Sequence, residues 1–357
     1  MNPPSRLVLR FLASVGRPAE AELYLSLFRA ERPESFALIA VDRDVTGVLA
    51  EALAVDLEFL AELGLTPVLA VGSAEQAAWL ERWLADSVRG EVVEPAGAAA
   101  VARAGRIPLV PIDPAGVPGL AAALASRKVV LLGPSGPLTR AGGEAVSIID
   151  VTSEYDALSA PGALPDPDRA TLARARAVLD AAPHGVTVSV TSPLALIREL
   201  FTVRGAGTLV RRGAAIAVHP GWGELDRARI ASLIEDAFGR PLRADFWDRP
   251  AERIYLAGDY RGAAVVERTE HGAYLSKLAV GAAARGEGIG RDLWRALVRD
   301  YASLYWRSRS RNPIAPWYQE QCDGMVKDGE WHVYWRGLAP ERIPEVIRAA
   351  RSAPVDL

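Results

Sequence analysis

A strand, a glycine-rich turn and a helix follow one another between Tyr274 and Tyr301. The apolar run Tyr274 to Val280 predicts a β-strand, the turn Arg285 to Gly290 holds three glycines in six residues, and Gly290 to Tyr301 repeats apolar residues with a helical period. Glycines let a backbone approach a ligand closely, and the start of a helix presents unpaired N–H groups. The segment therefore predicts an α/β fold with a cradle for an anion such as a pyrophosphate.

The bulk properties exclude several classes of protein. The chain has 357 residues, enough for two domains, and a net charge of −3, which argues against a nucleic-acid or anionic membrane partner. Its four histidines have no metal-ligand spacing and it has one cysteine, so we expect no metal site and no disulfide framework. No stretch is apolar enough to span a membrane. We expect a cytoplasmic protein, and the alanine, glycine, arginine and proline content suggests a bacterial one.

The two halves of the chain have different patterns. Strands alternate with helices up to about residue 205, as in the strand 66–71 and the helix 74–84, which predicts βαβ units around a parallel sheet. From Leu225 onward, consecutive strands joined by short turns predict a mixed α+β domain with antiparallel pairing. We place the domains at residues 1–208 and 209–357.

A group of arginines follows the glycine turn by about twenty residues. In an extended segment Arg307, Arg309 and Arg311 share one face, and arginine forks suit carboxylates because two N–H groups match two oxygens. Lys277 could add a further anchor for a dicarboxylate. For Arg311 a solvated position at a strand edge is the favoured interpretation.

Two other interpretations of the glycines remain open. A dinucleotide-binding site also uses glycines, but its G-x-G-x-x-G spacing differs from the G-x-G-x-G found here, and the acidic residue expected about twenty positions later is absent. A plain tight turn without a ligand is the second interpretation. The preceding strand and the arginine at the start of the turn favour a coenzyme A cradle.

The amino-acid sequence of this region resembles that of a known family. The segments 274–280, 286–290, 306–309, 312–313, 316–318 and 323–324 are similar to vertebrate-like N-acetylglutamate synthases, in which an amino acid kinase domain precedes a GNAT acetyltransferase domain. The turn resembles the Q/R-x-x-G-x-G/A turn of GNAT enzymes, with Arg285, Gly288 and Gly290 in the motif positions. The resemblance implies transfer of acetyl from acetyl-CoA to the α-amino group of L-glutamate.

The same resemblance implies roles for individual residues. Lys277, Arg309 and Asn312 match residues that contact the glutamate part of the ligand, and Tyr318 matches a tyrosine near the thioester that could protonate the leaving thiolate. The backbone of the strand would polarise the thioester carbonyl. The expected acetyl-CoA-binding set is Leu278, Ala279, Val280, Arg285, Gly286, Glu287, Gly288, Ile289 and Gly290. A core position is the alternative for Tyr318.

The N-terminal half resembles the kinase domain of the same family but lacks its phosphate-binding residues. The position of the expected lysine and paired glycines carries Asp42 and Asp44, which would repel phosphate, so we expect no acetylglutamate kinase activity. Glu199, Gly205, Gly207 and Thr208 resemble an arginine-binding signature. A histidine usual in that signature is Leu194 here, and ordinary helix capping is the alternative.

The sequence therefore predicts an arginine-regulated N-acetylglutamate synthase that assembles as a dimer or tetramer, with L-glutamate, acetyl-CoA and L-arginine as its small-molecule ligands. Two alternatives stay open at this point. The chain could acetylate another amino acid, or it could be an arginine-sensing subunit whose transferase is weak or inactive.

Overall fold

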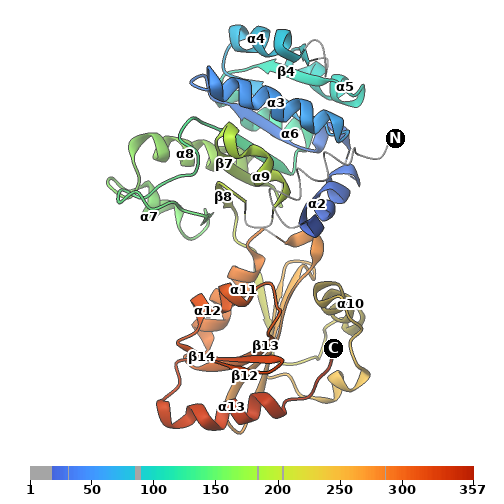
Figure 1. The fold of residues 1–357 in the computed structure, drawn as a ribbon, viewed down its shortest axis with the longest axis vertical. Helices are drawn as coiled ribbons and strands as arrows, with labels where there is room; N and C mark the ends of the chain where they lie inside the picture. Colours follow the sequence, from blue (N-terminus) through green and yellow to red (C-terminus); the bar gives the residue numbers. More distant parts are fainter. Residues whose placement is uncertain (1–17, 31, 85–89, 183–184, 203–204, 286) are drawn as a thin grey trace. The chain divides into compact units, whose positions relative to one another are not determined.

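The computed structural model describes residues 18–30, 32–84, 90–182, 185–202, 205–285 and 287–357 (Figure 1). The chain divides into two compact units, Met1–Gly213 and Ala214–Leu357. Strand β8 (Thr208–Arg211) pairs within the first unit, so the boundary falls after Gly213 and not at the expected 208/209. No helix among the described residues has the length and hydropathy that a membrane crossing requires.

The N-terminal unit is built on an eight-stranded sheet in the order β3-β4-β2-β1-β5-β7-β8-β6. All its strand pairs are parallel except β7 with β8. The expected parallel α/β arrangement is therefore confirmed. The other strands are β1 (Leu38–Val41), β2 (Val68–Val71), β3 (Gly90–Val92), β4 (Ile107–Pro111), β5 (Lys128–Leu132), β6 (Ile148–Asp150) and β7 (Thr187–Thr191).

Alternate side chains of these strands enter two separate cores. Ile39 and Val41 face one core, and Leu38 and Ala40 face the other, because successive side chains of a strand point to opposite faces. Helices α2 (Pro18–Ala30), α3 (Val48–Glu62), α4 (Ala74–Leu84) and α9 (Leu196–Phe201) contribute to the first core; α5 (Ala98–Arg103), α6 (Val117–Leu124), α7 (Tyr155–Ser159) and α8 (Asp166–Ala181) contribute to the second.

Three helices of this unit, α5, α6 and α7, were not expected from the pattern. Helix α5 begins at Ala98 and buries Ala98, Val101 and Ala102. Helix α6 likewise buries small residues among larger ones. Short helices made of small apolar residues have little hydrophobic contrast between their faces, so their period is hard to detect.

The C-terminal unit is built on a seven-stranded sheet in the order β14-β15-β13-β12-β11-β10-β9. Its pairs are antiparallel except β12 with β13, as the short turns of the sequence predict. The strands are β9 (Ile216–His219), β10 (Arg253–Ala257), β11 (Gly262–Thr269), β12 (Gly272–Val280), β13 (Leu304–Arg309), β14 (Gly324–Asp328) and β15 (Trp331–Arg336).

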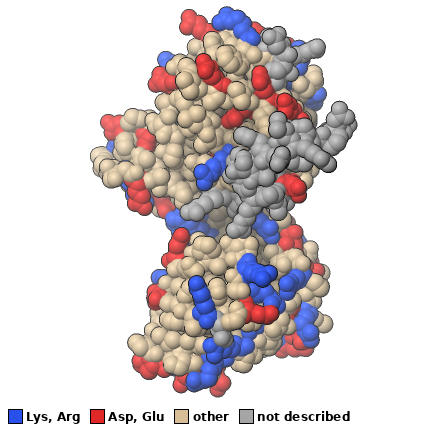
Figure 2. Space-filling view, in the orientation of Figure 1, with Lys and Arg blue, Asp and Glu red and all other residues tan. Residues whose placement is uncertain are grey.

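Helices cover both faces of this second sheet (Figure 1). Helices α11 (Ile289–Asp300) and α12 (Ala315–Gln321) pack on one face around Trp306, and α10 (Arg227–Phe238) and α13 (Ile343–Ser352) pack on the other. On the side drawn in Figure 2, acidic and basic side chains are intermixed over this unit.

Candidate active site

The parallel strands β12 and β13 pair over only two rungs and then separate. Tyr274 lies opposite Tyr305 and Leu275 opposite Trp306, and no later residues of the two strands are paired. On its other side β12 stays paired with β11 as far as Val280. The edge of β12 beyond Leu275 therefore faces an opening in the sheet. Since alternate residues of a strand direct their N–H groups to opposite edges, some backbone donors of 276–280 point into this opening.

A β-bulge lies where the separation begins. Val266 pairs with Leu275 and Val265 pairs with Lys277, so Ser276 is an extra residue on β12. The bulge shifts the alternation by one position, so that Leu275 and Leu278 pack on the α11 face, and Tyr274 and Lys277 lie on the opposite face. Bulges re-aim side chains in this way beside many active sites. Here the bulge turns the lysine away from the helix that follows the glycine turn.

Helix α11 begins at the glycine turn. Gly288 is the N-cap residue with φ of 78°, a left-handed conformation that favours glycine. Among the described residues, no acceptor is present for the N–H groups of Ile289 and Gly290. Gly262 on β11 also has to be small, because a Cβ there would lie 2.7 Å from Cγ2 of Ile289. The start of this helix offers donors to an anion.

Two charged side chains of the turn have protein partners. Arg285 donates to the carbonyl of Ala237 at 3.0 Å, at the end of α10, and Glu287 forms an ion pair with Arg261. Gly286, also expected to bind the cofactor, lies outside the described residues. Arg285 is thus held beside the cradle by the end of a neighbouring helix.

Tyr318 lies in the aromatic cluster on the α11 face. Its ring is 5.6 Å from that of Trp306 and 5.4 Å from that of Tyr334, and Leu278 and Val280 pack against the same cluster. Within the described part of the chain its hydroxyl has no hydrogen-bond partner. Burial raises the pKa of Tyr318 well above its ordinary value, so its phenol carries its proton at neutral pH. The side chain is both a core aromatic and a proton donor without a partner.

Lys277 lies on the opposite face of β12 and is almost fully buried. Its Nζ donates to both carboxylate oxygens of Asp356 at 2.8 Å and stands 5.1 Å from the ring centre of Phe246. Burial lowers the pKa of Lys277, and Asp356 partly offsets that effect. Burial alone would raise the pKa of Asp356, but Lys277 and Arg249 hold it below its usual range. The pair is therefore ionised and neutral overall.

Arg309 ends β13, and Asn312 shapes the turn that follows. Arg309 forms an ion pair with Glu330 at 3.3 Å, and its guanidinium lies 4.9 Å from the ring centre of Trp331. The side-chain oxygen of Asn312 accepts from the N–H of Ile314 at 3.1 Å, in the turn that precedes α12. Arg307 and Arg309 are alternate residues of β13 and therefore share a face. The strand ends at Arg309, so the exposed Arg311 lies in the turn. The cations thus lie on one face of the opening and Tyr318 on the other.

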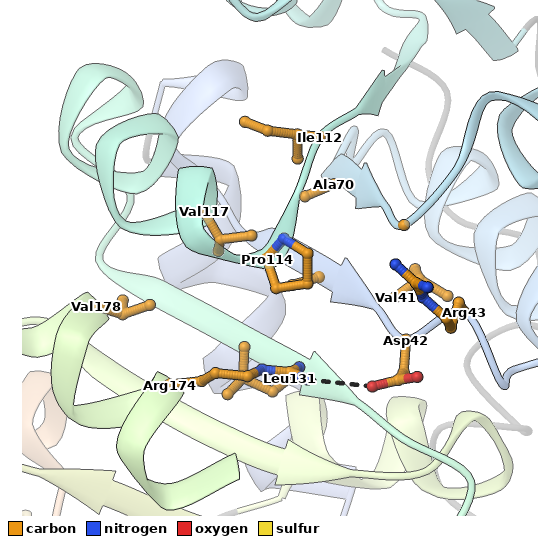
Figure 3. A pocket seen from close by; sticks show the side chains of 12 residues that line it. Val41, Asp42, Arg43, Ala70, Ile112, Pro114, Val117, Leu131, Arg174 and Val178 are labelled. Atoms are coloured by element: carbon orange, nitrogen blue, oxygen red, sulfur yellow. Dashed lines mark hydrogen bonds and ion pairs between the residues drawn. The ribbon is translucent and has the colours of Figure 1, made fainter. Parts of the chain in front are cut away.

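The N-terminal unit has a small cavity at the carboxyl ends of β1, β2 and β5 (Figure 3). Asp42 occupies its rim and pairs with Arg174 at 3.1 Å, and the backbone and Cβ of Arg43 lie next to Gly72. The cavity volume is about 40 Å³. Sites for drug-sized ligands are several times larger, so the carboxylate stands in a space too small for a nucleotide.

The four residues of the expected arginine signature lie together in the same unit. Glu199 is buried, and its Oε2 accepts from the N–H groups of Ala206 and Gly207 at 2.7 and 2.9 Å. Thr208 bonds the carbonyl of Val146 through its hydroxyl. A Cβ at Gly205 would touch the Glu199 carboxylate, and a Cβ at Gly207 would lie 2.3 Å from the Val190 carbonyl oxygen. In this structure two backbone N–H groups of the loop after α9 hold the Glu199 carboxylate, and the helix itself is capped at Thr202 and not by a glycine.

Some residues of the site have no signal in the sequence. Asp356 pairs with both Lys277 and Arg249 from a position far along the chain, and neither Asp356 nor Arg249 belongs to a motif. The bulge at Ser276 contains no glycine, so the sequence gives no signal that would predict it. Among the described residues no three or more histidine, cysteine or carboxylate side chains are grouped as a metal would require.

Fold and site together define the C-terminal unit as an N-acetyltransferase domain that follows a unit with an amino acid kinase-like fold. Residues 217–353 match the family model described as "NAT, N-acetyltransferase, of N-acetylglutamate synthase". The resemblance to N-acetylglutamate synthases stated from the sequence is thereby confirmed.

Two relatives and one solved structure support this assignment. The chain is 36% identical over 219 residues to a Xanthomonas campestris protein named acetylglutamate kinase, over 59% of this chain and 51% of that one. It is 32% identical over 242 residues to the mitochondrial N-acetylglutamate synthase of Mus musculus, over 66% of this chain and 46% of that one. The chain spans about half the length of these curated relatives.

The solved structure is N-acetylglutamate synthase from Neisseria gonorrhoeae, complexed with coenzyme A and L-arginine. It aligns with a TM-score of 0.55 and 18% identity over 89% of this chain and 97% of that one. This likeness shows that the two-part fold is shared.

Proposed function

We propose that the protein is an N-acetylglutamate synthase, which transfers the acetyl group of acetyl-CoA to the α-amino group of L-glutamate. The observation that carries this proposal is the opening between β12 and β13 after Leu275 and Trp306, together with the backbone N–H groups at the start of α11. The match of residues 217–353 to the acetyltransferase of N-acetylglutamate synthase supports the choice of acceptor.

In this proposal acetyl-CoA enters on the α11 face. The amides of Gly288, Ile289 and Gly290 hold the pyrophosphate, with Arg285 beside them, and Gly286 and Glu287 belong to the same turn. The backbone of Leu278, Ala279 and Val280 donates to the thioester carbonyl as negative charge develops on its oxygen. The separation of the strands leaves these backbone donors without a competing partner from β13.

Glutamate enters on the other face of the opening. Lys277, Arg309 and Asn312 bind it, and its uncharged amine attacks the acetyl carbon. The new C–N bond forms as the C–S bond breaks, and Tyr318 supplies a proton to the departing thiolate. The proton that the amine loses passes to water, and Tyr318 regains a proton from water. Because burial raises the pKa of Tyr318, its phenol is protonated in the resting protein and a proton is available when the thiolate forms.

We further propose that the N-terminal unit has no kinase activity. Asp42 stands at the end of β1, where a phosphate would have to lie, and its pairing with Arg174 closes the small cavity there. Pure protein supplied with ATP and acetylglutamate should release no ADP, and measurable release would contradict this statement. The proposed role of the unit is regulation by L-arginine through Glu199, Gly205, Gly207 and Thr208, and assembly of a cytoplasmic dimer or tetramer.

An acceptor screen tests the main proposal. Purified full-length protein, acetyl-CoA and one amino acid at a time are mixed, and free thiol is measured with and without L-arginine. Release with glutamate and none with ornithine or aspartate supports the proposal. Release of free thiol only with another amino acid would mean that this amino acid, and not glutamate, is the acceptor. No release of thiol with any amine would leave a sensing role for the N-terminal unit.

A further inference from the structure

The segment 353–357 leaves α13 and crosses the acceptor side of the opening. Arg307 on β13 donates to the carbonyl of Pro354 at 2.8 Å, and Lys277 on β12 donates to Asp356. The backbone N–H of Arg243 donates to the carbonyl of Asp356 at 3.0 Å, and Leu357 packs against the core that contains Phe246. The segment therefore connects the two separated strands on the face where the acceptor is proposed to bind.

The central contact of this segment is a carboxylate held by two cations. Asp356 accepts from Lys277 through both oxygens and from Arg249, and only 7% of the residue is exposed. Arg249 also lies 3.4 Å from Glu267. This is the chemistry that a site for an acidic amino acid requires, and it is filled by a side chain of the protein itself.

Charge counting around Lys277 leaves no cation there for a carboxylate of the acceptor. The cations Lys277 and Arg249 are already balanced by the anions Asp356 and Glu267. A carboxylate of the acceptor placed beside Lys277 would add a further negative charge to a buried place, where uncompensated charge is strongly disfavoured. If Asp356 moves away, Lys277 and Arg249 regain an excess of one positive charge and Arg307 loses a backbone acceptor, which suits an incoming carboxylate.

We propose that the segment 353–357 is an internal competitor of the acceptor, and that glutamate binds by displacing Asp356 from Lys277. This inference rests on the proposed function. The segment is suited to exchange, because it forms no strand pair and because Val355 is 49% exposed. Its polar contacts with the described residues, apart from those of the Asp356 side chain, involve only backbone carbonyls. A site that is free for only part of the time binds its ligand more weakly in proportion.

A different role for Asp356 would reverse the expected effect. If Asp356 served only to position the Lys277 ammonium, removing its charge would loosen the lysine and weaken glutamate binding. Under competition, removing the charge strengthens glutamate binding. The two roles thus predict opposite changes of the same quantity.

The experiment compares the full-length protein with its Asp356→Asn variant. Asparagine keeps the size of the side chain and removes its charge. We expect the KM for glutamate, and the Kd measured by calorimetry in the presence of CoA, to fall about tenfold. The control is Glu341→Gln, an exposed carboxylate outside the site, for which no change is expected. An unchanged or increased Kd for glutamate in Asp356→Asn would overturn the inference.

A second measurement needs no variant and so does not depend on how well one folds. Saturating glutamate should speed hydrogen exchange at the amide of Arg243, which donates to the carbonyl of Asp356, whereas saturating CoA alone should not. Equal exchange with and without bound glutamate would overturn the inference. Absence of acetyl transfer with glutamate refutes the proposed function, while the calorimetric comparison still tests whether Asp356 competes with glutamate.

Discussion

Leu275 of β12 lies opposite Trp306 of β13 in the last rung of the only parallel pair in the C-terminal sheet that the structure describes. One residue further, the bulge at Ser276 changes which face each β12 side chain takes. These two features place an aromatic cluster with Tyr318 on one side of the opening and Lys277 on the other.

The first prediction concerns the glycine that starts α11. Gly288→Ala forces a side chain into a left-handed conformation, so the free energy of unfolding should fall by about 1 kcal/mol. Because the same change turns the amides of the cradle, the KM for acetyl-CoA should rise. Gly64→Ala is the matched control, since Gly64 has φ of 76° with open space around it in the other unit. Both variants should lose stability, and an unchanged KM in Gly288→Ala would argue against the cradle.

The second prediction concerns the proton donor. Tyr318→Phe keeps the aromatic packing and removes the hydroxyl, so kcat should fall by about 100-fold while the KM for glutamate changes little. Tyr334→Phe is the control, because its ring belongs to the same cluster and stacks on Trp306 at 5.4 Å. Steady-state kinetics of the two variants decide the point. Equal kcat values in Tyr318→Phe and the unchanged protein would mean that Tyr318 acts only as a core residue.

The third prediction separates two neighbouring arginines. Arg309→Gln should raise the KM for glutamate by about thirtyfold, equivalent to about 2 kcal/mol for a lost charge-assisted hydrogen bond. Its ion pair with Glu330 is exposed, so stability should hardly change. Arg311→Gln alters an exposed turn residue and should leave the KM unaltered. If the two variants behave alike, Arg309 has no special part in binding the acceptor.

The fourth prediction concerns regulation. If L-arginine acts through Glu199, the Glu199→Gln variant should need about tenfold more L-arginine for half of the effect on the transfer rate. Glutamine can still accept from Ala206 and Gly207, so the local turn should persist. Glu144→Gln, an exposed change in the same unit, serves as the control. A variant that responds to L-arginine as the unchanged protein does would exclude Glu199 from the arginine site.

The fifth prediction is a pH dependence of stability. Burial raises the pKa of Asp56 on α3 from 3.8 to about 7, so the folded protein binds a proton there that the unfolded chain has released. The stability that this group contributes is therefore lost as the pH rises from about 4 to about 7, by at most about 1.4 kcal/mol per pH unit. Denaturant unfolding of Asp56→Asn should lack this loss, whereas Glu51→Gln, exposed on the same helix, should retain it. Parallel pH profiles of the unchanged protein and Asp56→Asn would contradict the raised pKa.

Local patterns predicted most regular elements well. The helix 74–84 has the expected bounds, because strong apolar periodicity and clear end signals lie within a few residues of each other. Elements of small residues, such as α5, were missed. Strand β14 was missed too: its partner β15 determines its pairing, and its own residues show little alternation.

The features of the site also fall into two groups, those that local sequence predicts and those that only the tertiary structure decides. The sequence by itself determined the glycine turn at 285–290, the absence of a phosphate-binding lysine after β1 and the arginines of β13, because each depends on residue types at short spacing. Only the tertiary structure decided that β12 separates from β13 after Leu275, and that Lys277 meets a carboxylate 79 positions later in the chain. Strand register and a contact over that distance follow from how the whole unit packs, and no local window of residues contains that information.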